Sequence, residues 1–199
     1  MTAQVPDHLC HENQEYRICA RSGDSPLFDP LIYGLNPAAP STASYRGWQA
    51  MFAVIESLVL ADLLVFHDAG HPIKNQRPNG PSIGGVMPTA PDSWVGFNCV
   101  YSGLSIPIEF TGGLVVSRDL VRGLASNSLS RPFWAFEQVK ELLFEHGVLV
   151  AAQDLSHVAA TVRKEHLVQG ILGRAAFTED EATRAQIEGE FSAHYDYLL

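Results

Sequence analysis

The sequence is short of basic residues, and this shortage excludes one class of function. Among 199 residues, 13 Lys and Arg stand against 22 Asp and Glu, so the formal net charge is −9 with histidine neutral. Proteins that bind nucleic acid normally carry a basic patch against the phosphate backbone. We therefore expect no nucleic-acid partner, while the excess of acid favours solubility and faster encounter with a basic partner.

Cysteine is scarce as well. Cys10, Cys19 and Cys99 are odd in number and lack CxxC spacing, whereas the disulfide framework of a secreted domain needs paired cysteines. The first residues, "MTAQVPDHLCHENQEYR", also lack the basic start and apolar run of a signal peptide. These features predict reduced thiols and a cytoplasmic protein.

No apolar run is long enough to suggest a membrane protein. The most apolar stretch, residues 50 to 66, is shorter than a spanning helix and is interrupted by Glu56 and Asp62. We therefore expect no membrane partner.

What is present is the composition of an ordinary globular protein. Apolar residues make up 46% and charged residues 18%, a balance that supports a packed core. No repeat or composition shift marks a boundary, so we predict a single domain over residues 1–199. Its predicted class is α+β, with an antiparallel β-sheet core, a flexible arm over 1–14 and a helical C-terminal part over 156–199.

Two stretches fit either strands or a helix. Residues 48–66 favour a hairpin joined at Glu56 and Ser57, because Val, Ile, Leu and Phe dominate and the lengths suit strands. A buried helix remains the alternative, since nearly every position is apolar and periodicity does not decide. In residues 136–146 and beyond, His146-Gly147 fits a hairpin turn, and Gly147 equally fits a helix end.

Other elements follow from local signals. A first strand is predicted at "EYRICAR", and a turn-rich segment over 22–44 holds at most a short strand at "LIY". Ser117 matches the N-cap of a short helix. Thr178 and Glu181 match the capping box of a last helix.

The stretch "FHDAGHPIKNQRPNG", residues 66 to 80, raises the question of a metal site. A zinc protease motif places two histidines four apart on a helix, with Glu beside the first. Here Asp68 takes that position between His67 and His71, and Gly70 and Pro72 break the helix. We predict a loop and expect no cofactor. A metal-dependent, hydrolase-like enzyme with a site around these histidines stays as an alternative, so enzymatic activity is left open and no catalytic residue is identified.

Loops rich in proline offer a second kind of site. Interfaces favour aromatic residues and Arg on loops held by a rigid sheet, so we expect binding through residues 36–48 and 67–95. Arg46 near Trp48 fits either a recognition pair or a strand entry with a snorkelling arginine. The predicted binding residues are Tyr45, Arg46, Arg77, Asp92 and Trp94.

The order of several segments resembles a group of small bacterial proteins without assigned activity. The resemblance covers residues 33 to 150 and is carried by "YGLNPAAPSTASYRGWQAMFAVIESLVLADLLV", "IGGVMP", "IPIEFTGGLVVSRDLV" and "FEHGVLV". It implies strands for the apolar stretches and supplies no catalytic residues. Small acidic bacterial proteins of this sort are similar in type to immunity proteins that neutralise toxins.

From these observations the predicted function is that of a cytosolic binding protein. Its most concrete form is an immunity-type inhibitor that neutralises a partner toxin, with a basic toxin domain as the partner. Besides the metal-dependent enzyme, the remaining alternative is a self-associating structural protein that forms a homodimer.

Overall fold

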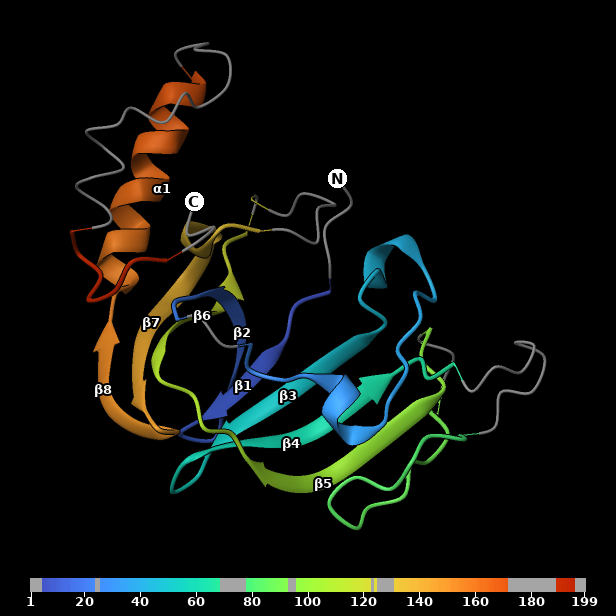
Figure 1. Cartoon of the computed structure of the whole chain (residues 1–199). Coiled ribbons are helices and arrows are strands. Elements are labelled where there is room, and N and C mark those ends of the chain that lie inside the picture. The colour runs from blue at the N-terminus through green and yellow to red at the C-terminus, as the bar shows by residue number, and fades with distance from the viewer. Residues whose placement is uncertain are drawn as a thin grey trace.

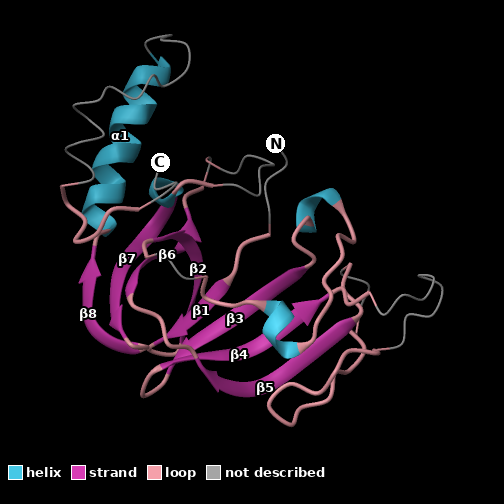
Figure 2. Ribbon diagram, viewed as in Figure 1, coloured by secondary structure: helices cyan, strands magenta, loops and turns pink. Residues whose placement is uncertain are grey.

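The computed structural model consists of one curved, eight-stranded β-sheet with a single α-helix in the described part of the chain (Figures 1 and 2). Within that part, no helix has both the length and the apolar character that a membrane crossing requires. The structure describes residues 5–23, 26–68, 78–92, 96–122, 124, 131–171 (backbone only from 166) and 189–195.

The sheet is mixed. Its strands lie in the order β5-β4-β3-β1-β2-β6-β7-β8, and β1 runs parallel to β3 whereas every other neighbouring pair is antiparallel. In chain order they are β1 (His8–His11), β2 (Gln14–Arg21), β3 (Trp48–Val54), β4 (Leu58–Val65), β5 (Cys99–Pro107), β6 (Gly112–Leu120), β7 (Phe136–Glu145) and β8 (Val148–Asp154). The helical segments are η1 (Pro30–Tyr33), η2 (Thr42–Ser44) and η3 (Phe133–Ala135), which are single 3-10 turns, and the α-helix α1 (Ser156–Ile171).

The fold class predicted from the sequence is wrong. The sheet dominates the structure and is mixed rather than antiparallel, because the chain leaves β2 through a long loop and returns as β3 in the direction of β1. Helix was predicted over 156–199. In the described part of that range it occupies only Ser156–Ile171, and residues 189–195 form turns and bends. The C-terminal helix is thus one cover on a sheet-dominated fold.

The two stretches whose sequences fitted either strands or a helix both form β-hairpins. Residues 48–66 form β3 and β4, paired antiparallel from Trp48 with Val65 to Val54 with Leu58. β7 and β8 pair across a turn in which His146 has φ 47° and Gly147 has φ 78°. Two consecutive positive φ values match the twist of flanking strands, which explains why this sequence turns rather than ends a helix.

Three local predictions differ from the structure. Ser117 lies inside β6 instead of capping a helix, because Val115 and Val116 are buried on opposite faces of the sheet, as period-two alternation requires. Residues 8–11, expected in the arm, form β1. The "LIY" segment belongs to η1. The capping box at Thr178 lies outside the described residues.

Each face of the sheet has its own core. The inner face carries a cluster that contains Leu60 of β4, Tyr101 of β5 and Phe144 of β7, and strands so far apart in the sheet meet only on a concave side. The outer face of β6 and β7 is covered by α1 and by residues 189–195. The helix α1 therefore packs on the half of the sheet that contains β6, β7 and β8, on the outer face (Figure 1).

The curvature brings hairpin turns of the two halves into contact. Leu58 N, at the start of β4, donates a hydrogen bond to Gly147 O in the β7–β8 turn at 2.7 Å. Ile108 N, just beyond β5, donates to Leu58 O at 2.9 Å, and Gly147 N donates to Phe110 O at 2.8 Å. A Cβ at Gly147 would overlap the Ile108 carbonyl oxygen, so glycine is needed here for both its φ and this approach.

Candidate functional site

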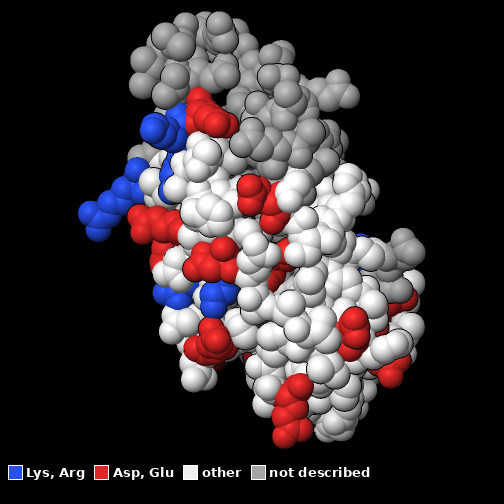
Figure 3. Space-filling view, turned by 90° about the vertical axis from the view of Figure 1, so that its left-hand side faces the viewer, with Lys and Arg blue, Asp and Glu red and all other residues white. Residues whose placement is uncertain are grey.

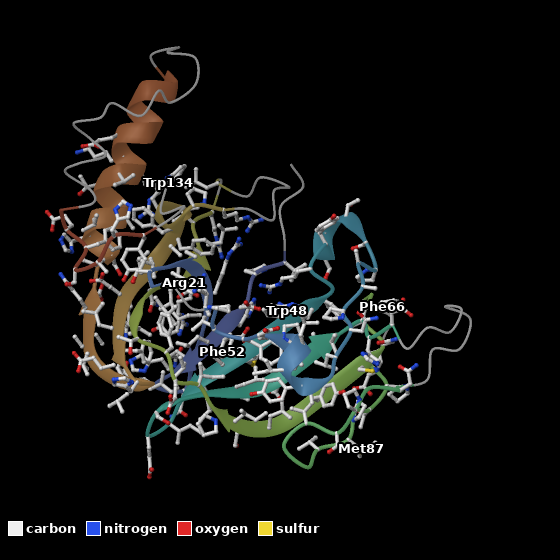
Figure 4. The ribbon with its side chains drawn as sticks, in the orientation of Figure 1. Arg21, Trp48, Phe52, Phe66, Met87 and Trp134 are labelled. Carbon is white, nitrogen blue, oxygen red and sulfur yellow. The ribbon has the colours of Figure 1, made fainter. Side chains whose placement is uncertain are left out.

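The segment of residues 26–47, which we call the presenting loop, lies over the inner face of the sheet. Leu27, Phe28 and Leu35 are buried in the inner core. The Phe28 ring stacks on Tyr33 at 5.5 Å between centroids and meets the edge of Trp48 at 5.2 Å. Figure 4 labels Trp48 near the centre of the molecule. These aromatic contacts fix the loop against β3 although it contains only two 3-10 turns.

The same loop turns two aliphatic side chains to solvent. Leu31 is 66% and Ile32 is 72% exposed, in the middle of η1. Asp29 Oδ1 accepts a hydrogen bond from Leu31 N at 2.9 Å, which starts the 3-10 turn, and Gly34 ends it in the left-handed conformation with φ 71°. Because this short turn separates the buried residues on either side, Leu31 and Ile32 are held out of the core.

A set of four residues, the His67 junction (Asn36, His67, Asp68 and Asn98), ties the presenting loop to the end of β4. Asn36 N donates to His67 Nδ1 at 2.9 Å, and Asp68 N donates to Asn36 O at 2.9 Å. His67 N donates to Asn98 Oδ1 at 2.8 Å, and Asn98 Nδ2 returns a bond to His67 O at 2.9 Å. The junction therefore fixes three separate segments of chain.

The chemistry of His67 suits this structural role. Its Nδ1 accepts a backbone hydrogen bond, so the neutral ring carries its proton on Nε2 and offers no free lone pair to a metal. Burial lowers the pKa of His67 below its ordinary value, with an opposing contribution from Asp68. Within the described residues, no three His, Cys, Asp or Glu side chains are grouped to hold an ion. His71 lies outside those residues.

Arg46 is committed to the protein itself. Its guanidinium donates to both carboxylate oxygens of Asp7, at 2.9 Å from Nη1 to Oδ2 and at close range from Nη2 to Oδ1. Its Nε donates to Trp48 O at 2.8 Å, and its Cζ lies 3.9 Å from the centroid of the Trp48 ring. Asp7 Oδ1 in turn accepts from Ala50 N at 2.8 Å. The arginine thus packs at a strand entry, the second of the two roles that the sequence left open.

The other predicted binding residues are spread over the loops. Tyr45 is 77% exposed directly after η2, and Asp92 is exposed on the segment that leads to β5. Pro40 of the presenting loop approaches that segment, since a Cβ at Gly96 would lie 3.7 Å from the proline side chain. Arg77 and Trp94 lie outside the described residues, so the structure does not place them.

Two thiols and a buried carboxylate are further candidate reactive groups among the described residues. Burial raises the pKa values of the Cys19 and Cys99 thiols, opposite to the direction that activates a nucleophile. Glu141 is 1% exposed, and its carboxylate accepts from Ser192 N at 2.9 and 3.0 Å and from the Tyr195 hydroxyl at 2.8 Å. This carboxylate fastens residues 189–195 to the outer face.

Leu31 and Ile32, the most exposed aliphatic side chains of the presenting loop, were not predicted from the sequence. The signal that marks them is the sequence Asp29-Pro30 followed by Gly34, which combines a cap, a first-turn proline and a left-handed terminator around a single turn. Comparison with known proteins gives no relative: no protein family, no curated protein and no solved structure matches this chain.

Proposed function

We propose that this chain is an immunity-type binding protein of the cytosol that neutralises a toxin by direct contact through the presenting loop. One observation supports the proposal: Leu31 and Ile32 are exposed on a loop whose neighbouring residues are buried in the inner core. Exposed apolar side chains on an ordered support are typical of interfaces, because little conformational entropy is lost when they bind.

The charge of the chain indicates the kind of toxin domain. A net charge of −9 attracts a basic partner, and Asp68 and Asp92 are exposed acids on the segments beside the presenting loop. Attraction of this kind raises the association rate more than it slows dissociation, and salt screens it. Association with the toxin should therefore slow as salt is added.

The test uses the product of the gene next to this one, co-expressed in a host that it harms. Wild-type chain should restore growth, and the double variant Leu31→Asp/Ile32→Asp should not. Its binding, measured with purified proteins, should weaken by roughly tenfold or more, as expected for central interface residues. Ile55→Asp is the matched control, because Ile55 is 72% exposed in the β3–β4 turn, away from the loop.

Two results would count against this function. One is a neighbouring product that neither harms the host nor binds the chain. The other is full protection by the Leu31→Asp/Ile32→Asp variant, which would place the interface elsewhere. A thermal melt of each variant separates lost binding from lost folding.

A further inference from the structure

Strand β8 is an open edge of the sheet. It is the last strand in the sheet order, and every residue from Val148 to Asp154 is exposed except the half-buried Leu149. Val148 is 50% and Val150 is 52% exposed. An edge strand leaves one row of backbone N–H and C=O groups without a strand partner, which makes it a template for another strand.

The opposite edge, β5, is protected. Thr89 and Val100 exchange two backbone hydrogen bonds of 2.9 Å, so a neighbouring segment already occupies the start of this edge. Farther along, Ser105 has φ 54°, and the strand ends at Pro107, which has no N–H. Bends and proline are the usual means by which natural sheets block edge pairing.

β8 carries one irregularity, at Val150, which is skipped between the pairs Leu143–Ala151 and Phe144–Leu149, and it has no other protection of this kind. From Val148 to Gln153 its sequence is VLVAAQ, with no charge and no proline, and the only charged residue is Asp154 at its end. Asp154 is engaged there, since its Oδ1 accepts from Ser156 N at 2.8 Å where α1 begins. Figure 3 faces the flank that carries β8 and α1, where acidic and basic side chains are interspersed with uncharged surface.

We propose that β8 pairs antiparallel with β8 of a second copy of this chain, so that the sheet continues across a two-fold axis. A basic toxin would find no carboxylate along VLVAAQ to attract it, whereas an identical strand presents the same apolar side chains. With Ala151 on the axis, the two Asp154 residues lie at opposite ends of the paired strands, and the skipped residue Val150 makes the pairing between them irregular. No like charges then face each other directly.

This interface is independent of the presenting loop, and salt distinguishes the two. Two copies of net charge −9 repel each other, and added salt screens that repulsion. The dimer should therefore tighten as salt is added, whereas association with a basic toxin slows. The loop variant Leu31→Asp/Ile32→Asp should form the same dimer as the wild type.

Sedimentation velocity of the full chain at micromolar concentration gives the first test. Wild type should sediment as a dimer, Val150→Lys as a monomer, and the exposed-residue control Ile55→Lys as a dimer. A monomeric wild type, or a Val150→Lys variant that stays dimeric, would overturn the proposal. Thermal melts confirm that each variant is folded.

Cross-linking tests the register. Directly opposite residues in an antiparallel pair have Cα atoms about 4.5 to 5.5 Å apart, a spacing that a disulfide spans. In a Cys10→Ser background, Ala151→Cys should form a covalent dimer on mild oxidation, and Ile55→Cys should not. Equal cross-linking of both variants would mean random collision and would contradict the paired edge.

Discussion

In each half of the sheet, a tyrosine hydroxyl donates a hydrogen bond and packs against a glycine, but the tyrosine belongs to the sheet in one half and to the covering segment in the other. On the β5 side, the hydroxyl of Tyr101 donates to Pro81 O at 2.8 Å, and a Cβ at Gly80 would overlap that hydroxyl oxygen. On the β8 side, the hydroxyl of Tyr195 donates to Glu141 at 2.8 Å, and a Cβ at Gly113 would overlap it. Each tyrosine thus needs a glycine beside it.

The two halves differ in whether the tyrosine lies on a strand or on the segment that covers the strands. Tyr101 is part of β5 and holds the segment that also reaches the β5 edge through Thr89. Tyr195 is part of the C-terminal segment and is held by β6 and β7, on a face rather than along an edge. A cover along an edge closes it to other strands, whereas a cover on a face leaves the edge strand β8 exposed. The bonds between Thr89 and Val100 therefore close the start of the β5 edge, whereas β8 is paired only with β7.

The largest expected effect is at Tyr101. Tyr101→Ala should lower the free energy of unfolding by about 3 to 5 kcal/mol, because a fully buried ring is lost from the inner core. Tyr101→Phe keeps the ring and removes only the hydrogen bond to Pro81 O, so this variant should lower the free energy of unfolding by about 1 kcal/mol. Urea denaturation measures both. Equal losses would mean that the hydroxyl, not the ring, fastens this half.

Next in size is Gly113→Ala on the other half. The added methyl overlaps the Tyr195 hydroxyl and should lower the free energy of unfolding by about 1 to 3 kcal/mol. Because Tyr195→Phe removes the overlapping oxygen, the double variant should lose less than the sum of the two single variants. Strict additivity in the same denaturation assay would rule out the contact.

Glu141→Gln should have a smaller and more local effect. The amide keeps one acceptor oxygen but turns its NH2 group toward donors, so the loss in unfolding free energy should be about 1 to 2 kcal/mol. Hydrogen exchange should quicken at Ser192 N–H and stay unchanged at Thr89 N–H. Faster exchange at both amides would show that the two halves are not fastened separately.

The smallest effect concerns pH and the His67 junction. Burial lowers the pKa of His67 below its ordinary value of 6.5, so the folded chain binds this proton less readily than the unfolded chain. The stability that neutral His67 contributes is present above pH 6.5 and is lost as the pH falls through the lower folded pKa. Between pH 7 and pH 5, His67→Gln should lose less stability than wild type does. An unchanged pH dependence would mean that other groups cause the loss of stability at low pH. His11 is one such group, because burial lowers its pKa as well.

The β3–β4 hairpin was favoured from the sequence because its signals are local, whereas the residues of the β7–β8 hairpin fitted a turn and a helix end equally. β3 and β4 are short, mostly apolar strands of 7 and 8 residues on either side of Glu56, and His146-Gly147 fits a turn. The parallel pairing of β1 with β3 was not predictable, since it depends on where a long loop returns the chain. Sequence patterns report which residues form strands, and they carry little information on strand order.

The candidate site was predictable only in part, for a similar reason. A proline-rich loop near residues 36–48 indicated a surface held by the sheet. The role of Arg46 was left open because its carboxylate partner, Asp7, is 39 residues away in sequence. His67 depends in the same way on Asn36. Leu31 and Ile32 are apolar, a type that usually predicts burial, so their exposure emerges only when the turn around them is known.

The central position of β1 has a consequence for how the chain folds. This strand of four residues is bonded on both sides, to β2 nearby in sequence and to β3 across the presenting loop. Its pairing with β3 joins the halves through three residue pairs, His8–Met51, Leu9–Phe52 and Cys10–Ala53. Closing so long a loop before its contacts form is entropically unfavourable, and such non-local pairing slows folding. The rate of folding is therefore expected to depend on how soon the centre of the sheet forms.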